Sequence, residues 1–464
     1  MPRFAGSLTR HPARVSFFWF AGVILFGAVL LTLPFARGAR SLAENRPVSP
    51  LDAAFMSTSA VCVTGLAVRS VGHDFSFLGQ LVIAGLVQVG GIGIMTVTTF
   101  VSFSFGAKES LRQRAVISET LGAGPQADLR WVLRGVLATT AIIETVGAFI
   151  LAVNFWLRYG FEWKAAIWHG VFHSIAAFCN AGFGLEDDNL VKYQSDPVVN
   201  LVIIVQVVLG GIGFPVILDW MRHRRMPIAE RWHRMLLHSK LMILGTCGLL
   251  LLGTVGFLVL EWDNALAEMP WWEKIMVSVF QAATPRTAGF NTVDYARLTN
   301  ATLFITMLLM LIGAGPCSTG GGFKVSTLMV LVTRAWATYQ GYSRVHLFRR
   351  TIPHQIVERA VATALLFTVI AVLGLTAVLV VEQSAATDPA GDSLFRDAAF
   401  ECVSALGTVG LSTGLTTKLS GIGRMIIIGL MFLGRLGPLS VFIALARSDR
   451  DQKIEFASEV PLIG

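Results

Sequence analysis

The sequence is poor in charged residues, and this scarcity excludes a soluble protein. Only 14% of its 464 residues are charged, 54% are hydrophobic, and the mean hydropathy is +0.65. A soluble domain covers its surface with more charge than this. The first apolar run, residues 15–35, carries no charge and can cross a bilayer core of roughly 30 Å. It is too long for the apolar core of a cleaved signal peptide, so we interpret it as a retained membrane helix.

Cysteine is scarce as well. The five cysteines are widely spaced and form no CxxC pair: Cys62, Cys179, Cys247, Cys317 and Cys402. This spacing argues against a zinc site and against a disulfide framework. Because all five lie in or beside apolar segments, we expect small buried hydrophobic side chains.

Long apolar segments are abundant. Eight of them cover residues 15–35, 77–105, 131–157, 198–218, 241–260, 301–333, 360–381 and 422–446. A shorter, semi-polar stretch that ends in glycine lies within each pair, at residues 50–68, 164–185, 271–291 and 393–411. Each stretch is too short and too polar to cross a membrane. Its size suits a helix that enters the membrane, followed by a loop that returns.

The ends of these four stretches repeat one another. We call them the glycine strings: Val63-Thr64-Gly65, Asn180-Ala181-Gly182, Thr287-Ala288-Gly289 and Thr408-Val409-Gly410. A large apolar residue follows each string, and the four glycines are 117, 107 and 121 residues apart. Each following span contains a further glycine cluster, at residues 90–93, 210–213, 313–316 and 434–438. Four matches in the same place relative to the spans indicate a fourfold internal repeat.

The repeat predicts an all-α integral membrane fold, in which four helix–pore-loop–helix units surround a central pore with pseudo-fourfold symmetry. The expected units are residues 1–107, 108–222, 223–340 and 341–464, the last with a cytoplasmic C-terminal tail. The segments on the side of the termini hold 21 Lys and Arg, against 12 on the other side. The positive-inside rule therefore places both termini in the cytoplasm. The excess positive charge, +8 in total, then lies on the cytoplasmic side, where the lipid is anionic. Nucleic-acid binding would need a basic face with residues that read bases, and the sequence shows none.

The glycine strings suit ion conduction. Non-helical backbone at membrane depth needs protein, water or ions to satisfy its polar groups. Four loops around one axis would direct four sets of carbonyls at a line, and such rings replace the hydration shell of potassium. Glycine reaches the backbone conformations that turn carbonyls inward. The alternative, packing glycines between helices, explains the glycines inside the spans better than the repeated strings.

On these strings the chain resembles the Trk/Ktr/HKT superfamily of potassium transporters over nearly its whole length. It begins directly at the first repeat, and is therefore most similar to the bacterial Ktr membrane subunit. The resemblance implies K⁺ uptake through a selectivity filter of string carbonyls, in the bacterial inner membrane. It also implies a homodimer with one pore per protomer and a cytosolic ring of nucleotide-binding regulatory subunits. Serine at the first filter glycine accompanies sodium preference in the plant branch, whereas this chain has Gly65. Cys179 and Cys317 depart from the family pattern without removing a filter carbonyl.

The third repeat contains an interrupted span. Its candidate gate residues lie within residues 313–324: Gly313, Ala314, Gly315, Gly320, Gly321, Gly322 and Lys324. Five glycines and a proline in this run cannot form a stable helix. The run resembles the intramembrane gating loop of the family, and a phosphate-binding loop would require a Gly-Lys-Ser/Thr string that is absent. Arg435, an expensive charge inside the last span, is expected beside this loop, either donating to its carbonyls or tying helices together.

Several charged groups are weaker candidates. Glu144 shares a span with Arg134, and His169 and His173 share one helix face, which allows a metal site. An outer acidic set could concentrate cations at the mouth or be solvated loop: Glu186, Asp187, Asp188 and Asp294. A basic cytoplasmic set could dock the regulatory ring or contact anionic lipid: Arg222, Arg224, Arg225, Arg349 and Arg350.

Three rival functions remain open. One is a sodium-selective or poorly selective member of the same superfamily, and Na⁺ could also serve as a co-ion. Another is a polytopic membrane enzyme, which should show convergent His, Asp, Glu or Ser residues at one membrane depth; the strings offer backbone instead. A third is a transporter with inverted repeats, but these repeats restart on the same side and are therefore parallel. We expect no covalently bound cofactor.

Overall fold

The computed structural model describes residues 12–437, apart from residues 46, 107–128, 349 and 386–390. Parts of the predicted topology lie outside the described residues: the N-terminal segment, the basic connection at residues 107–128, Arg349 and the tail at residues 438–464. The described chain is mostly helical, as its composition predicts.

The helices follow one pattern four times along the chain. A long helix comes first: α2 (Pro12–Thr32), α8 (Leu129–Tyr159), α13 (Leu237–Leu260) and α17 (His354–Ala385). A short helix packs against it: α4 (Pro50–Val61), α9 (Trp163–Phe178), α14 (Trp271–Ala283) and α18 (Gly391–Gly407). A second apolar helix then begins at α6 (Phe77–Gly106), α10 (Pro197–Ile212), α15 (Asn300–Leu311) and α19 (Gly421–Leu436).

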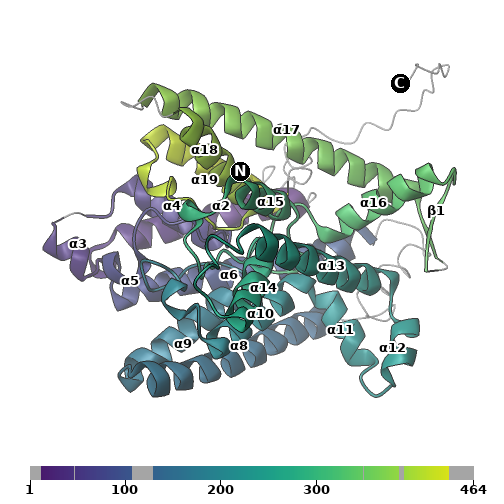
Figure 1. The fold of residues 1–464 in the computed structure, drawn as a ribbon, viewed down its shortest axis with the longest axis horizontal. Coiled ribbons are helices and arrows are strands. Elements are labelled where there is room, and N and C mark those ends of the chain that lie inside the picture. Colours follow the sequence, from purple (N-terminus) through teal and green to yellow (C-terminus); the bar gives the residue numbers. More distant parts are fainter. Residues whose placement is uncertain (1–11, 46, 107–128, 349, 386–390, 438–464) are drawn as a thin grey trace, which may run out of the picture.

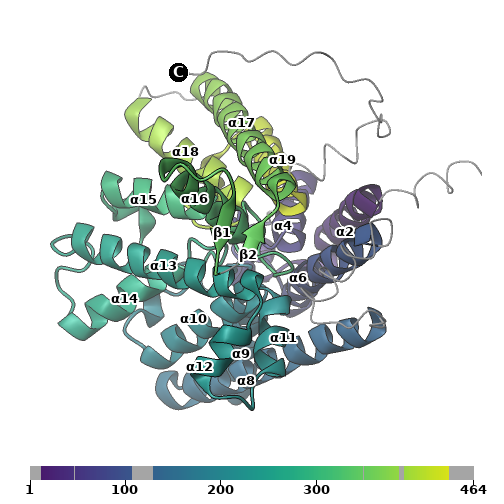
Figure 2. The same ribbon diagram turned by 90° about the vertical axis from the view of Figure 1, so that its right-hand side faces the viewer.

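The four groups of helices succeed one another around the middle of the molecule. In Figure 2 they pass from α2, α4 and α6 through α8–α10 and then α13–α14 to α17–α19. The last group packs on the first, since α19 contacts α4. Large apolar side chains such as Leu25, Phe149 and Leu251 point outward and are about two-thirds exposed, at 68%, 70% and 67%. Such an outer surface suits lipid rather than water.

Only some of the eight expected spans are continuous helices. Within the described residues three helices are long and apolar enough to cross a membrane: Arg134–Tyr159, Leu237–Leu260 and His354–Ser384. The prediction of an interrupted third-repeat span is confirmed, because residues 312–324 separate α15 from α16 (Val325–Tyr339).

A second interruption was not predicted. The chain bends by 94° between α10 and α11 (Phe214–Arg222). Gly213 joins the two helices with φ +97°, a conformation that favours glycine, and Pro215 lies in the first turn of α11. The expected span at residues 198–218 is therefore divided at Gly213, which turns the chain and also packs closely against the carbonyl of Pro316.

Shorter elements gather at the two ends of the molecule (Figure 1). At one end lie α3 (Ala39–Ala43) and α5 (Val71–Asp74), and single 3₁₀ turns precede or follow the main helices at Pro34–Ala36, Val191–Tyr193, Tyr295–Arg297 and Thr416–Lys418. At the other end lie α12 (Ile228–Arg234) and a hairpin of β1 (Val345–Leu347) and β2 (Arg350–Ile352). In this antiparallel hairpin Val345 pairs with Ile352, and both pack in a cluster with residues of α16 and α17.

We expect Gly213→Ala to lower the stability of the protein by about 1–3 kcal/mol, because a left-handed conformation is strained for alanine. A Cβ at this position would also lie 2.5 Å from the carbonyl oxygen of Pro316. The unfolding midpoint of purified protein in detergent measures the effect. Gly248→Ala is the matched control, since nothing lies within 4 Å of a Cβ there and alanine favours the surrounding helix. An unchanged midpoint for Gly213→Ala would contradict this account of the bend.

Candidate functional site

The four glycine strings share one unusual backbone conformation. In each, the first residue and the glycine have positive φ. The values are 54° and 97° for Val63 and Gly65, 59° and 66° for Asn180 and Gly182, 71° and 76° for Thr287 and Gly289, and 51° and 97° for Thr408 and Gly410. A positive φ is rare for β-branched residues and costs on the order of 1–3 kcal/mol. The same costly turn at all four positions indicates one shared geometric requirement.

The strings also touch one another in a closed ring. A Cβ on Gly65 would collide with the carbonyl oxygen of Ala181, and one on Gly182 would lie 2.7 Å from the Cα of Gly289. Likewise, a Cβ on Gly289 would collide with the carbonyl oxygen of Val409, and one on Gly410 with that of Thr64. Each string therefore lies against the next, and the fourth lies against the first. Only glycine permits this approach of backbone to backbone.

Each string directly follows the C-terminal end of a short helix and is hydrogen-bonded to it. The N–H of the middle residue donates to a carbonyl in the last helical turn or at its C-cap: Thr64 to Ser59 at 2.8 Å, Ala181 to Ala176 at 2.7 Å, Ala288 to the C-cap residue Thr284 at 2.9 Å and Val409 to Ser404 at 2.8 Å. Four helix C-termini thus meet at the ring. The negative end of the helix dipole favours a cation at this place.

The glycine-rich loop, residues 312–324, packs against two of the strings. The N–H of Gly321 donates to Oγ1 of Thr408 at 3.1 Å. A Cβ on Gly320 would collide with Oγ1 of Thr287. The two ends of the loop are joined, since the N–H of Gly313 donates to the carbonyl of Phe323 at 2.7 Å. The predicted gate segment therefore lies in direct contact with the ring.

The loop is also fastened to the broken end of α10. The N–H groups of Gly315 and Thr319 donate to the carbonyls of Gly211 at 2.8 Å and Gly210 at 3.1 Å. Beyond the break, the N–H of Phe214 donates to the carbonyl of Cys317 at 3.1 Å. The bend after α10 frees carbonyls that the loop then satisfies.

Two cations, the buried Arg435 and the half-buried Lys324, bind carbonyls of the loop. Arg435 is 2% exposed; its Nη1 donates to the carbonyl of Thr319 and its Nη2 to that of Gly90 at 2.6 Å. Nζ of Lys324 donates to the carbonyls of Gly320 at 2.7 Å and Gly321 at 3.1 Å. In the part of the chain that the structure describes, neither cation has an ion pair with a carboxylate. Arg435 thereby connects α19, the loop and α6.

An open depression of about 610 Å³ reaches the strings and is lined by Gly65, Gly182 and two members of the outer acidic set, Glu186 and Asp187. Asp187 accepts hydrogen bonds from Arg40 at 3.0 Å and from Ser70, and lies 3.1 Å from Nδ1 of His73. Partial burial raises the pKa of Asp187, but these partners outweigh it and leave the pKa below its ordinary value.

The other members of the outer acidic set are paired or exposed. Glu186 lies 3.7 Å from Lys192 and Asp294 lies 3.3 Å from Arg297, whereas Asp188 is exposed. Most of this acidic charge is neutralised by neighbours within the protein. The set therefore offers less free negative charge to a passing cation than its composition suggests.

The remaining candidates have packing environments. Nδ1 of His173 donates to the carbonyl of His169 at 2.8 Å, and both rings pack on Phe155. No group of three potential ligands suited to a metal ion occurs among the described residues. Glu144 accepts from Nε2 of Gln88 at 2.8 Å rather than pairing with Arg134 in its own helix.

Three of the five cysteines are buried as expected: Cys62, Cys179 and Cys402. Cys317 is half-buried, and Cys247 is exposed on the outer face of α13. The prediction of a buried side chain is wrong for Cys247, because one face of a membrane helix contacts lipid and accepts a small apolar group there.

Sequence reasoning missed an ion-pair network between the first and last helix groups. Asp52, 3% exposed at the start of α4, lies 2.6 Å from Nη1 of Arg424 in α19 and 3.0 Å from Nε of Arg69. It ties the ring together where the fourth group meets the first. The only signal in the sequence was a carboxylate within a semi-polar stretch.

Fold and ring together define a class: polytopic helical membrane proteins in which non-helical backbone from four helix groups meets at one centre. The chain belongs to the TrkH family of cation transport proteins, whose sequence profile matches residues 31–454. The resemblance to the Trk/Ktr/HKT superfamily is thereby confirmed.

Known proteins are similar over almost the whole chain. The Ktr system potassium uptake protein B of Bacillus subtilis (strain 168) is 38% identical over 441 residues, 95% of this chain and 94% of that protein. The potassium/sodium uptake protein NtpJ of Enterococcus hirae is 34% identical over 446 residues, 95% of each chain. The crystal structure of the potassium transporter TrkH from Vibrio parahaemolyticus aligns with a TM-score of 0.70 at 18% identity, covering 93% of this chain and 83% of that one. At that identity the structural likeness establishes the fold.

Proposed function

We propose that this chain is a potassium uptake transporter that passes K⁺ inward through a selectivity filter made of the four glycine strings. The closed ring of left-handed turns is the observation that carries the proposal. Potassium exchanges its hydration shell for the string carbonyls, and the four helix C-termini stabilise its charge. The names of the relatives, a potassium uptake protein and a potassium/sodium uptake protein, support a monovalent cation as the cargo.

Location and direction belong to the same proposal. The chain lies in a bacterial inner membrane with both termini in the cytoplasm, as the distribution of Lys and Arg indicates. The depression of about 610 Å³ is the outer mouth. The glycine-rich loop then lies on the inner side of the filter.

Sodium transport is the second candidate. The potassium/sodium name of one relative favours it, since that protein is 34% identical to this chain. Glycine at all four filter positions favours potassium, because each position has the same backbone and no side chain narrows the ring.

We expect Gly65→Ser to weaken discrimination of potassium over sodium. A Cβ at residue 65 collides with the carbonyl oxygen of Ala181 and so displaces a quarter of the ring. Competitive K⁺ and Na⁺ uptake by potassium-requiring cells measures the effect, with Gly85→Ala as control because nothing lies within 4 Å of a Cβ there. Unchanged selectivity in a well-folded Gly65→Ser protein would remove Gly65 from the filter.

The glycine-rich loop is the proposed gate. It contacts Thr408 and Thr287 directly, and it carries the positive charge of Lys324 and the bound Arg435 into the ion path. These two cations, which have no carboxylate partner among the described residues, oppose the passage of a third. Movement of the loop away from the ring would remove both the steric and the electrostatic barrier.

Shortening the loop within residues 314–322 should therefore raise ion flux per folded protein. Arg435→Ala should act in the same direction, because the carbonyl of Thr319 in the loop and that of Gly90 in α6 both lose their donor. Arg435→Lys retains the positive charge but cannot contact two carbonyls with one planar guanidinium, so its flux should lie between that of the parent protein and that of Arg435→Ala. Flux into proteoliposomes, normalised to folded protein, is the measurement. A folded, shortened variant that conducts no faster would contradict the gate while leaving the filter standing.

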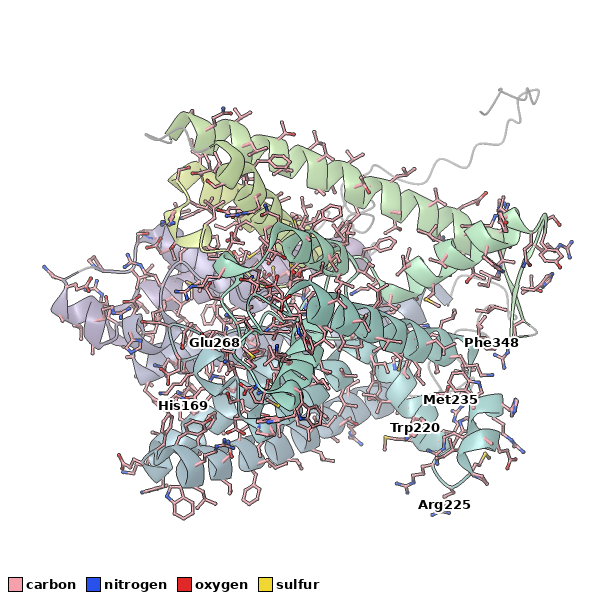
Figure 3. All side chains as sticks on the ribbon, viewed as in Figure 1. His169, Trp220, Arg225, Met235, Glu268 and Phe348 are labelled. Carbon is pink, nitrogen blue, oxygen red and sulfur yellow. The ribbon has the colours of Figure 1, made fainter. Side chains whose placement is uncertain are left out.

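We further propose a homodimer whose cytoplasmic end docks a ring of nucleotide-binding subunits. Figure 3 places Trp220, Arg225 and Phe348 at the same end of the molecule as α12 and the hairpin. The guanidinium of Arg231 stacks on Trp220 at 4.4 Å, so this end combines basic and aromatic groups. Such a surface suits an acidic protein face, with anionic lipid as the alternative occupant.

Charge reversal at Arg224, Arg225 and Arg350 should abolish co-purification of a regulatory subunit expressed in the same cells. Arg297→Glu is the matched control, because that arginine is highly exposed at the outer end. Retained assembly in the triple variant would move the docking surface elsewhere.

A further inference from the structure

Two of the four glycine strings are held from behind by a serine hydroxyl. The N–H of Gly65 donates to Oγ of Ser59 at 3.0 Å, and the N–H of Gly410 donates to Oγ of Ser404 at 3.0 Å. Each serine precedes its glycine by six residues and lies on the last turn of a short helix. Both serines are completely buried.

The other two strings lack this arrangement. The equivalent positions are Ala176 and Ala283, which have no hydroxyl to offer. In the third string the N–H of Gly289 donates to a backbone carbonyl, that of Thr284, at the long distance of 3.4 Å. Side chains contact these two loops at carbonyls instead: Nδ2 of Asn189 donates to the carbonyl of Gly182 at 2.8 Å, and the hydroxyl of Thr284 donates to the carbonyl of Phe290. The ring is therefore fourfold in its backbone but not in its support.

The serine contact orients a carbonyl as well as an N–H. The N–H of Gly65 and the C=O of Thr64 belong to one planar trans peptide group and point in opposite directions. The carbonyl of Thr64 faces the neighbouring string, as the carbonyl of Ala181 does in a string without the serine, and the contact of the N–H with Ser59 restrains this peptide group against rotation. A Cβ on Gly410 would collide with this very oxygen, which confirms where it points. The same geometry joins Ser404, Gly410 and the carbonyl of Val409.

We propose that Ser59 and Ser404 are positioning residues that set potassium-over-sodium selectivity by fixing the peptide groups 64–65 and 409–410. This inference rests on the proposed filter function. The two serine-held strings are neighbours in the ring, so the fixed carbonyls form one side of it. A peptide group that is free to rotate can close around a smaller ion. A fixed one keeps its carbonyl at the distance that suits the larger ion.

A matched control lies two residues away on the same helix. Ser57 is also completely buried, but its hydroxyl donates to the carbonyl of Ile24 at 2.7 Å and does not contact a string. Ser57→Ala and Ser59→Ala remove the same atom from the same short helix. Only the second variant releases a filter peptide group.

The test compares competitive K⁺ and Na⁺ uptake by the full-length chain in proteoliposomes, together with the unfolding midpoint of each variant. We expect Ser59→Ala and Ser404→Ala each to lower the ratio of Na⁺ to K⁺ half-saturating concentrations by a factor on the order of ten, because a buried N–H loses its acceptor. Ser59→Thr keeps the hydroxyl and should restore the parental ratio. Ser57→Ala should lower the midpoint without changing the ratio.

The outcomes separate this inference from the filter itself. If Gly65→Ser changes the ratio but both serine-to-alanine variants keep it, the positioning role is overturned and the filter stands. If neither Gly65→Ser nor the serine variants change the ratio, the filter proposal fails too. If Ser57→Ala changes the ratio as much as Ser59→Ala, the effect is one of general helix packing, which also overturns the positioning role.

Discussion

A peptide group inside a bilayer has no water to bind, so each of its N–H and C=O groups needs a partner within the protein. Helices meet this requirement internally, and the non-helical segments of this chain meet it through each other. The loop at residues 312–324 donates to Gly210 and Gly211, whose carbonyls α10 leaves free where it bends. The break after α10 and the break between α15 and α16 therefore depend on each other, because each supplies the hydrogen-bond partners of the other.

The same requirement explains why charges lie where they would otherwise be costly. Arg435 and Lys324 together supply donors to four backbone carbonyls of the loop and of α6. A cation that is partly or wholly removed from water usually needs a counter-charge, but here the carbonyl dipoles provide the compensation. An arrangement that satisfies the loop thus also places positive charge beside the ring. The same cationic groups therefore satisfy the backbone carbonyls of the loop and form the proposed barrier to ion flow.

Prediction from the sequence succeeded where several signals coincided. The strings around Gly65 and Gly410 stood out because they recur at the same place relative to the spans, and the break at residues 312–324 because its glycines cannot sustain a helix. The bend at Gly213 could not be predicted, since a glycine cluster in an apolar run has the same sequence pattern whether it packs helices together or ends a helix. For Glu144 the sequence shows only that Arg134 shares its span, whereas its observed partner Gln88 lies in another helix.

The sequence by itself determined the helical membrane class, the fourfold pattern and the family, because hydrophobic length and repeated glycines are local properties of the chain. Tertiary structure alone decided which string touches which, that the loop rests on Thr287 and Thr408, and that serine supports only two of the four strings. These features depend on atoms that are distant in the sequence, 87 residues apart for Gly321 and Thr408, or on the direction of a single N–H group. The hydrophobic pattern and the composition do not determine the direction of an N–H group. Packing around a shared centre does, because it leaves each backbone group one partner within hydrogen-bonding distance.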